Sequence, residues 1–199
     1  MTRGAPIRIA RPEDRGVVVD TVVQAFAADP AWTFLLGDHY SEHAPAFAGA
    51  LFDGRVDDGT VWITAEPGGV AMWDRPRSDG TSPPRHHIWD PYRRLVGEQS
   101  WSRLEAYESA CDRVKPAQPY WYLGVLATHP DRQGQGIGSA LIGSGVARAD
   151  EAGTDCCLET SSLGNREFYE RRGFTIASPV PWDGPVTWWL RRESSGPGG

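Results

Sequence analysis

The sequence has 199 residues but only one lysine, three cysteines and no long apolar run. Acidic residues outnumber basic ones by 26 to 20, a net charge of −6, so the chain lacks the positive charge with which nucleic-acid-binding proteins neutralise phosphates. No segment approaches the roughly 18 apolar residues of a membrane span, and the first residues lead into a charged segment without the apolar stretch of a signal peptide. We therefore expect a cytoplasmic protein without a nucleic-acid or membrane partner.

Signals for disulfides and metal sites are also scarce. Cys111, Cys156 and Cys157 are odd in number and lack metal-ligand spacing, so the sequence predicts neither a disulfide framework nor a zinc site. His39 and His43 are four residues apart, as a helical metal pair would be, but we identify no third ligand for them. We therefore expect no bound metal.

The composition is that of a globular protein, with 40% apolar and 23% charged residues. At this length a single hydrophobic core remains efficient. We expect one domain over residues 1–194, followed by a flexible tail at 195–199. The sequence leaves open whether the protein is a monomer or a homodimer.

Strand-like and helix-like patterns follow one another along the chain and predict a mixed sheet with helices on its faces. Asp29 and Pro30 suit the start of a helix, because Asp is a good N-cap and Pro fits the first turn. The predicted strands are 7–10, 61–64, 70–73, 120–128, 155–160, 174–177 and 186–190. The predicted helices are about 12–26, 30–53 with an interruption near Gly37, 91–114 after a Pro-rich loop at 74–87, 138–149 and 165–172.

A glycine run between a predicted strand and a predicted helix is the most informative motif. It reads Gln133-Gly134-Gln135-Gly136-Ile137-Gly138. Alternate glycines let the chain turn sharply and expose its N–H groups, and the helix dipole adds positive potential. An anion, most naturally a pyrophosphate, fits such a loop, although the glycines alone are equally consistent with a tight turn. The run matches neither the phosphate-binding loop of nucleotide hydrolases nor the dinucleotide-binding fingerprint.

This run resembles the signature of the GCN5-related N-acetyltransferases (GNAT family), Arg/Gln-x-x-Gly-x-Gly/Ala at the start of a helix. A second block of that family is matched by Asn165, Phe168-Tyr169 and Gly173-Phe174. The segments 122–126, 158–161 and 187–188 resemble the puromycin N-acetyltransferase branch. The resemblance extends from residue 7 to 190 and is strongest over 119–176. It implies an α/β fold with a mixed, mostly antiparallel sheet of about six or seven strands, splayed between its two central strands, with helices on both faces.

The resemblance also implies acetyl-CoA as the acyl donor. In this family main-chain groups of one splayed strand pair with the pantetheine arm, and the glycine-loop amides hold the pyrophosphate. Pantetheine amides are able to add to a strand edge as an extended peptide does. For Asn165, helix N-capping is the alternative role. The implied donor-binding residues are Leu126, Thr128, Gln133, Gly134, Gln135, Gly136, Gly138, Ser139 and Asn165.

Two residues are candidates for proton transfer. Tyr169 matches the family's general-acid tyrosine, and its alternative role is that of a core aromatic residue. Some family members carry a His or Glu base on the strand before the glycine loop, but Tyr122 and Gly124 occupy the corresponding positions, and neither is a base at neutral pH. Glu159, at the end of the next strand, is the nearest carboxylate. It is a candidate base, or merely a charge at a strand end.

Nine tryptophans are an unusually large number, and several aromatic residues fall in the half that the family uses for its acceptor pocket. Aromatic side chains would stack on an aromatic or heterocyclic amine. We expect Trp32, Phe34, Trp89 and Tyr122 to bind the acceptor. Asp29, Asp38 and Glu42 lie near these aromatics in the sequence and would attract a cation.

The predicted function is acetyl-CoA-dependent N-acetylation of a small, aromatic amine, such as an antibiotic or a pathway intermediate. The sequence leaves two alternatives open. An enzyme that acetylates a protein N-terminus or lysine would need an open groove with acidic side chains. A non-catalytic acyl-CoA-binding module would explain the missing base, but the presence of Tyr169 argues against it.

Overall fold

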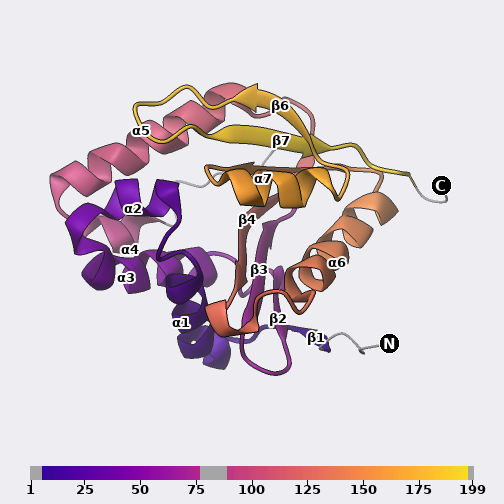
Figure 1. The fold of residues 1–199 in the computed structure, drawn as a ribbon, viewed down its shortest axis with the longest axis horizontal. Helices are drawn as coiled ribbons and strands as arrows, with labels where there is room; N and C mark the ends of the chain where they lie inside the picture. Colours follow the sequence, from indigo (N-terminus) through magenta and orange to yellow (C-terminus); the bar gives the residue numbers. More distant parts are fainter. Residues whose placement is uncertain (1–5, 77–88, 197–199) are drawn as a thin grey trace.

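The computed structural model describes residues 6–76 and 89–196, which fold around a seven-stranded sheet (Figure 1). Its order is β1-β2-β3-β4-β5-β7-β6. The strands are β1 (Ile7–Ile9), β2 (Val61–Thr64), β3 (Gly69–Asp74), β4 (Tyr120–Thr128), β5 (Asp155–Thr160), β6 (Thr175–Pro179) and β7 (Trp188–Arg192). The α-helices are α1 (Arg15–Ala25), α2 (Pro30–Leu36), α3 (Tyr40–Asp53), α4 (Asp90–Arg93), α5 (Glu98–Val114), α6 (Ile137–Glu151) and α7 (Leu163–Glu170).

The two central strands, β4 and β5, diverge along their length. They form the parallel pair of an otherwise antiparallel sheet, and their register extends from Tyr120 opposite Asp155 to Tyr122 opposite Cys157. Beyond Tyr122, β4 continues to Thr128 in register with β3 on its other side. This confirms the predicted mostly antiparallel sheet that splays between its central strands.

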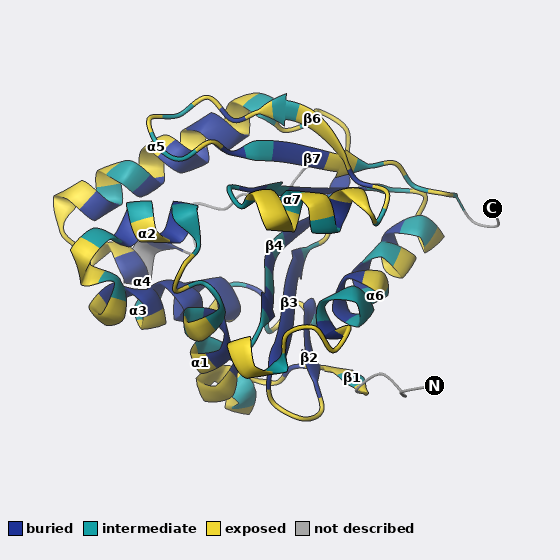
Figure 2. Cartoon of the chain, viewed as in Figure 1, coloured by how far each residue is buried: buried dark blue, intermediate teal, exposed yellow. Residues whose placement is uncertain are grey.

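Helices cover both faces of the sheet because successive strand residues point to opposite sides. On β3, Val70 and Met72 join the core beneath α1 to α5, whereas Ala71 and Trp73 face α6 and α7. The buried positions in Figure 2 accordingly follow the strands and the inner sides of the helices. At one point α6 approaches Trp73 so closely that a Cβ on Gly145 would collide with the indole ring.

The predicted helix over 91–114 is instead two helices, α4 and α5. The first helix ends at Arg93, and Gly97 takes the N-cap position of α5 in an extended conformation, with φ −69° and ψ 160°. Leu95, expected on the helix, lies between the two and is 64% exposed, whereas Leu104 and Tyr107 are buried in the core. Most of the predicted loop at 74–87 lies outside the described residues.

The segment 30–53 has the predicted interruption. A short 3-10 turn, Gly37–His39, separates α2 from α3, and Gly37 adopts the positive φ of 57° that favours glycine. Asp29 caps α2 as expected, with Pro30 as the first helical residue. Among the described residues, no helix has the length and apolar character needed to cross a bilayer.

Candidate functional site

The glycine run forms an open loop at the start of α6. Gly134 and Gly136 have φ angles of 75° and 78°, a region that residues with a side chain rarely adopt. A Cβ added at either position would meet no atom within 4 Å, so the loop has free space beside it. Gly136 is the N-cap of the 15-residue helix α6. Because the first N–H groups of a helix lack intrahelical partners, this arrangement suits an anion.

A cavity of about 470 Å³ runs from this loop along β4. Of the residues predicted to bind the donor, Gln135 alone does not line it, and the other eight do: Leu126, Thr128, Gln133, Gly134, Gly136, Gly138, Ser139 and Asn165. Leu126 and Thr128 belong to the part of β4 that has separated from β5. The structure therefore brings a strand edge and a helix N-terminus to the same cavity, which we call the loop cavity.

Two arginines lie in or next to the wall of the loop cavity, and the sequence analysis predicts a role for neither. Arg132 lines it and donates to Glu66 Oε2 at 3.1 Å. Arg172, at the end of α7, donates to the Ser139 hydroxyl and lies over the Phe168 ring. Arg132 directly precedes the glycine run, so its position was visible in the sequence, whereas Arg172 is brought to Ser139 by the packing of α7 against α6.

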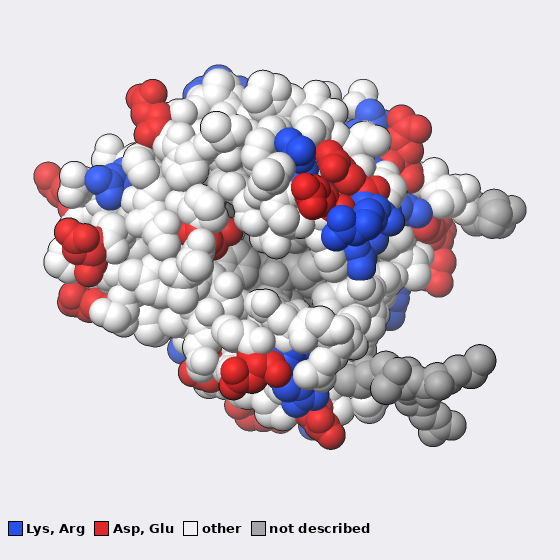
Figure 3. All heavy atoms as spheres, in the orientation of Figure 1, with Lys and Arg blue, Asp and Glu red and all other residues white. Residues whose placement is uncertain are grey.

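A second cavity, which we call the inner cavity, adjoins the first and has a volume of about 80 Å³. Its lining is rich in aromatic residues, namely Phe26, Trp32, Phe47, Trp89, Tyr107, Tyr122 and Tyr169, and includes the acids Asp29, Glu108 and Glu159. Five residues line both cavities: Phe26, Asp29, Leu126, Asn165 and Tyr169. Figure 3 shows the hollow on this face of the molecule, bordered largely by uncharged residues. A molecule in one cavity would thus contact a molecule in the other.

Glu159 lies in the wall of the inner cavity and is held there by two tyrosines. The hydroxyl of Tyr122 donates to Glu159 Oε1 at 2.5 Å, and that of Tyr107 donates to the same oxygen at 3.1 Å. The ring of Tyr122 stacks on Trp189 with centroids 5.9 Å apart. Burial raises the pKa of Tyr107 well above its usual value, so this phenol stays protonated and remains a donor. The three residues come from β5, β4 and α5.

Tyr169 lies at the junction of the two cavities and is buried. Burial, followed by the charges of Asp29 and Glu159, raises the pKa of its hydroxyl above the usual 10. Asn165, one helical turn earlier, also lines both cavities. The alternative role of Asn165 as a helix N-cap is wrong, because Ser162 is the N-cap of α7 and accepts the Asn165 N–H at 3.3 Å.

Asp29 is the carboxylate at the junction. Its Oδ1 accepts the main-chain N–H groups of Ala31 and Trp32, each at 3.0 Å. Burial raises its pKa above 3.8 and outweighs these two hydrogen bonds, which act in the opposite direction. Asp38 and Glu42, the other acids expected near the aromatics, are exposed and lie outside the lining of both cavities.

Three of the four predicted acceptor residues line the inner cavity: Trp32, Trp89 and Tyr122. Phe34 does not line either cavity. It packs edge-on against Trp182, with ring centroids 5.3 Å apart. The guanidinium carbon of Arg103 lies over the Phe34 ring, 4.9 Å from its centroid. Because residues two apart on a helix point in different directions, α2 cannot present Phe34 to the cavity that Trp32 lines.

Comparison with known proteins is consistent with this geometry. The sequence profile described as "Acetyltransferase (GNAT) domain" matches residues 96–176. An uncharacterized N-acetyltransferase of Schizosaccharomyces pombe is 24% identical over 173 residues, which cover 80% of this chain and 70% of the relative.

Solved structures share the fold over nearly the whole chain. A Corynebacterium glutamicum structure described as "histone acetyltransferase HPA2 and related acetyltransferase" has a TM-score of 0.68 at 24% identity, covering 99% of this chain and 100% of that one. The arylalkylamine N-acetyltransferase 2 of Aedes aegypti has a TM-score of 0.69 at 11% identity, covering 96% of this chain and 99% of that one. A Drosophila melanogaster polyamine N-acetyltransferase has a TM-score of 0.64 at 14% identity, covering 94% of this chain and 99% of that one. None of these relatives is a puromycin acetyltransferase, so that branch stays a prediction.

Proposed function

The chain belongs to the GNAT acetyltransferase family, and we propose that it transfers an acetyl group from acetyl-CoA to the amine of a small aromatic molecule. One observation carries this proposal. An aromatic, acidic inner cavity meets the loop cavity at five shared residues, so an acceptor amine and an acyl donor would come into contact there. Amine-bearing antibiotics and pathway intermediates are the acceptor classes that we expect.

The loop cavity fits acetyl-CoA. The open space beside Gly134 and Gly136 and the N-terminus of α6 suit a pyrophosphate, and Arg132 adds a positive charge. The separated part of β4 offers main-chain groups at Leu126 and Thr128 to the amides of the pantetheine arm. Bound there, acetyl-CoA would supply an activated acyl carbonyl.

The acids of the inner cavity serve the acceptor amine. Most amines are protonated at neutral pH, so the site must attract an ammonium group and then remove its proton. Asp29 and Glu159 provide negative charge in the wall of the cavity. We assign Glu159 as the base, because the two tyrosine donors on its Oε1 fix its carboxylate in place. Asp29 holds the ammonium group at the junction.

Tyr169 is assigned as the general acid. Transfer from a thioester leaves a thiolate that needs a proton. Because burial raises the pKa of the Tyr169 hydroxyl, the residue carries its proton at neutral pH and has it available for donation at the junction.

The inner cavity also favours a small acceptor over a protein. Trp32 meets Phe47 edge-on at 4.7 Å, and Phe47 stacks on Trp89 at 4.8 Å and an angle of 13°. Buried rings of this kind form a wall on which a flat ring would stack, whereas an extended peptide would need an open groove. The arylalkylamine activity named for a structural relative agrees with this acceptor class.

The proposal is tested by measuring the release of free CoA thiol with a panel of amines. The panel contains arylalkylamines, linear polyamines, aromatic amine antibiotics and lysine-containing peptides. We expect the highest kcat/KM with an aromatic amine. A preference for peptides would instead indicate a protein acetyltransferase. Binding of acetyl-CoA by calorimetry without thiol release from any amine would indicate a non-catalytic binding module.

A further inference from the structure

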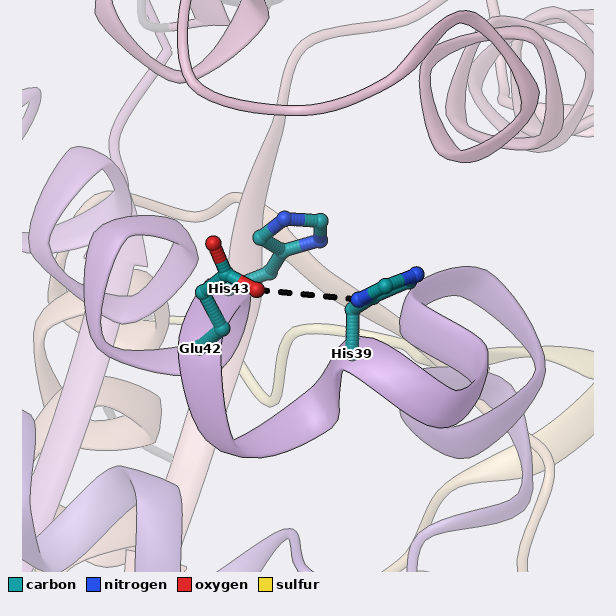
Figure 4. A group of neighbouring side chains, drawn as sticks. All are labelled: His39, Glu42 and His43. Atoms are coloured by element: carbon teal, nitrogen blue, oxygen red, sulfur yellow. Dashed lines mark ion pairs between the residues drawn. The ribbon is translucent and has the colours of Figure 1, made fainter.

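Three side chains with metal-binding atoms lie together at the start of α3, two of them exposed and one buried, and none of them lines either cavity. His39 ends the 3-10 turn before α3, and Glu42 and His43 lie in the first turn of α3. His39 Nδ1 is 3.6 Å from Glu42 Oε2, and the two imidazole rings stack with centroids 5.2 Å apart (Figure 4). One ligand atom from each residue lies within 4.8 Å of the others. We propose that His39, Glu42 and His43 form a binding site for a divalent transition metal such as Zn²⁺.

The backbone explains why the three residues converge. His39 is the N-cap of α3, and Tyr40, the first residue of the helix, has helical angles of φ −50° and ψ −51°. His39 is therefore one turn before His43, and residues three or four apart share one face of a helix. The sequence expectation of no metal depended on the lack of a third ligand. Glu42 supplies that ligand.

His43 provides an independent reason to expect a ligand. Its side chain is buried, with the residue only 8% exposed, and its Nδ1 has no hydrogen-bond partner among the described residues. Buried polar atoms are nearly always satisfied, so a buried imidazole nitrogen without a partner requires an explanation. Figure 4 shows the His43 ring beside the His39 ring, on the same side of the helical turn. A metal held between these side chains would satisfy the nitrogen.

The donor atoms select the class of metal. Two imidazoles and one carboxylate suit Zn²⁺, Ni²⁺ or Cu²⁺, whereas Mg²⁺ and Ca²⁺ prefer oxygen ligands alone. Ligands at about 2.0–2.1 Å from a tetrahedral Zn²⁺ are about 3.3 Å from each other. The 3.6 Å between His39 and Glu42 is close to that value. The longer separations need to close by about 1.5 Å, and the side chains of His39 and Glu42, which are 65% and 73% exposed, are free to rotate.

Such a metal would stabilise the first turn of α3, the helix that carries Phe47 in the aromatic wall of the inner cavity. Phe47, one turn after His43 on α3, contacts Trp32, Trp89 and Tyr92. A metal that binds the folded cluster more tightly than the unfolded chain stabilises the fold by mass action. We therefore expect Zn²⁺ to raise the melting temperature, in addition to binding with a stoichiometry of one.

The test uses the full chain without a histidine tag. Zn²⁺ binding is measured by calorimetry, and Co²⁺ binding by its visible absorption. Loss of an outer-shell partner alone weakens metal sites about 10- to 100-fold, so His39→Gln and His43→Gln should each weaken Zn²⁺ binding by about 100-fold or more. Glu42→Gln should weaken it by at least about 10-fold. The double variant His86→Gln/His87→Gln is the control, because it removes two of the five histidines and changes none of the three cluster residues.

Each outcome of these measurements either supports or overturns the metal site. Binding of one equivalent that is lost in the cluster variants and kept in the control supports the site. Unchanged affinity in His39→Gln, loss of binding in the control, or no binding by the unmodified chain overturns it. His39 is exposed, so its substitution leaves the core intact and the result does not depend on the fate of His43→Gln. None of these measurements uses acetyl transfer, so the metal site stands or falls independently of the proposed function.

Discussion

Asp29 has two roles, helix capping and charge, that substitutions are able to separate. Its Oδ1 accepts the N–H groups of Ala31 and Trp32 at 3.0 Å, and its carboxylate lines the junction of the two cavities. Asp29→Asn keeps an oxygen that caps α2 and removes the charge. Asp29→Ala removes both. The pair of variants therefore measures the cap and the charge independently.

The expected change in stability follows from these contacts. Loss of an N-cap costs about 1 kcal/mol, which in a chain of this length corresponds to roughly 2–4 °C in melting temperature. Asp29→Ala should show a loss of this size at most. Because burial raises the pKa of Asp29, its ionised form is less favourable in the folded chain than in the unfolded one. The stability contribution of the carboxyl group is therefore complete below its ordinary pKa of 3.8 and is lost as pH rises through the raised value. Asp29→Asn should thus gain stability relative to the unmodified chain between about pH 3 and pH 7.

The effect on catalysis should be the same in both variants. A hydrogen bond to a charged group contributes about 1.5–3 kcal/mol, so loss of the carboxylate should lower kcat/KM for an ammonium-bearing arylalkylamine by roughly 10- to 100-fold. An arylamine that is uncharged at the assay pH serves as the matched substrate and should lose much less. Melting curves between pH 3 and pH 7 and thiol-release kinetics provide the two measurements. Equal losses for both substrates, or full activity in Asp29→Asn, would refute the role of the charge.

Three further substitutions test the remaining assignments. Gly138→Glu should abolish acetyl-CoA binding by calorimetry, because it adds bulk and negative charge at the anion site, whereas Gly138→Ala should bind, since its Cβ would meet Phe168 at an ordinary 3.5 Å. Tyr169→Phe should lower kcat on the order of 10²-fold with unchanged donor affinity, and an unchanged kcat would leave Tyr169 a packing residue. Glu159→Gln should reduce the rate most at low pH, with a loss that shrinks towards the pKa of the amine. A profile parallel to that of the unmodified chain would contradict its role as the base.

Elements with local signals could be predicted from the amino-acid pattern. The strand at 120–128 and the strand at 155–160 appear in the structure with their predicted bounds. The glycine run opens α6 as expected, because φ angles near 75° at Gly134 and Gly136 are a requirement that glycine meets directly. The break at Gly37 and the cap at Asp29 follow from short-range chemistry of the same kind.

The errors occurred where local signals compete. One helix is predicted across 91–114, but α4 ends at Arg93 and α5 begins only after Gly97. The resemblance places both Trp32 and Phe34 in the half that shapes the acceptor pocket, but the turn of α2 directs them to different surroundings. Nearness along the chain is a poor guide to a shared cavity when the element is a helix.

Which side chains meet in the site depends on long-range packing. Tyr107 and Tyr122 reach the same oxygen of Glu159 from 52 and 37 residues away, because β4 and β5 are neighbours in the sheet and the fold brings Tyr107 of α5 to the end of β5. Asp29 and Tyr169 line one junction although 140 positions separate their numbers in the chain. Propensities and turn chemistry act over a few residues, so they specify where helices and strands begin. The order of the strands and the packing of the helices are set by burial of the whole core, and these long-range features bring the site together.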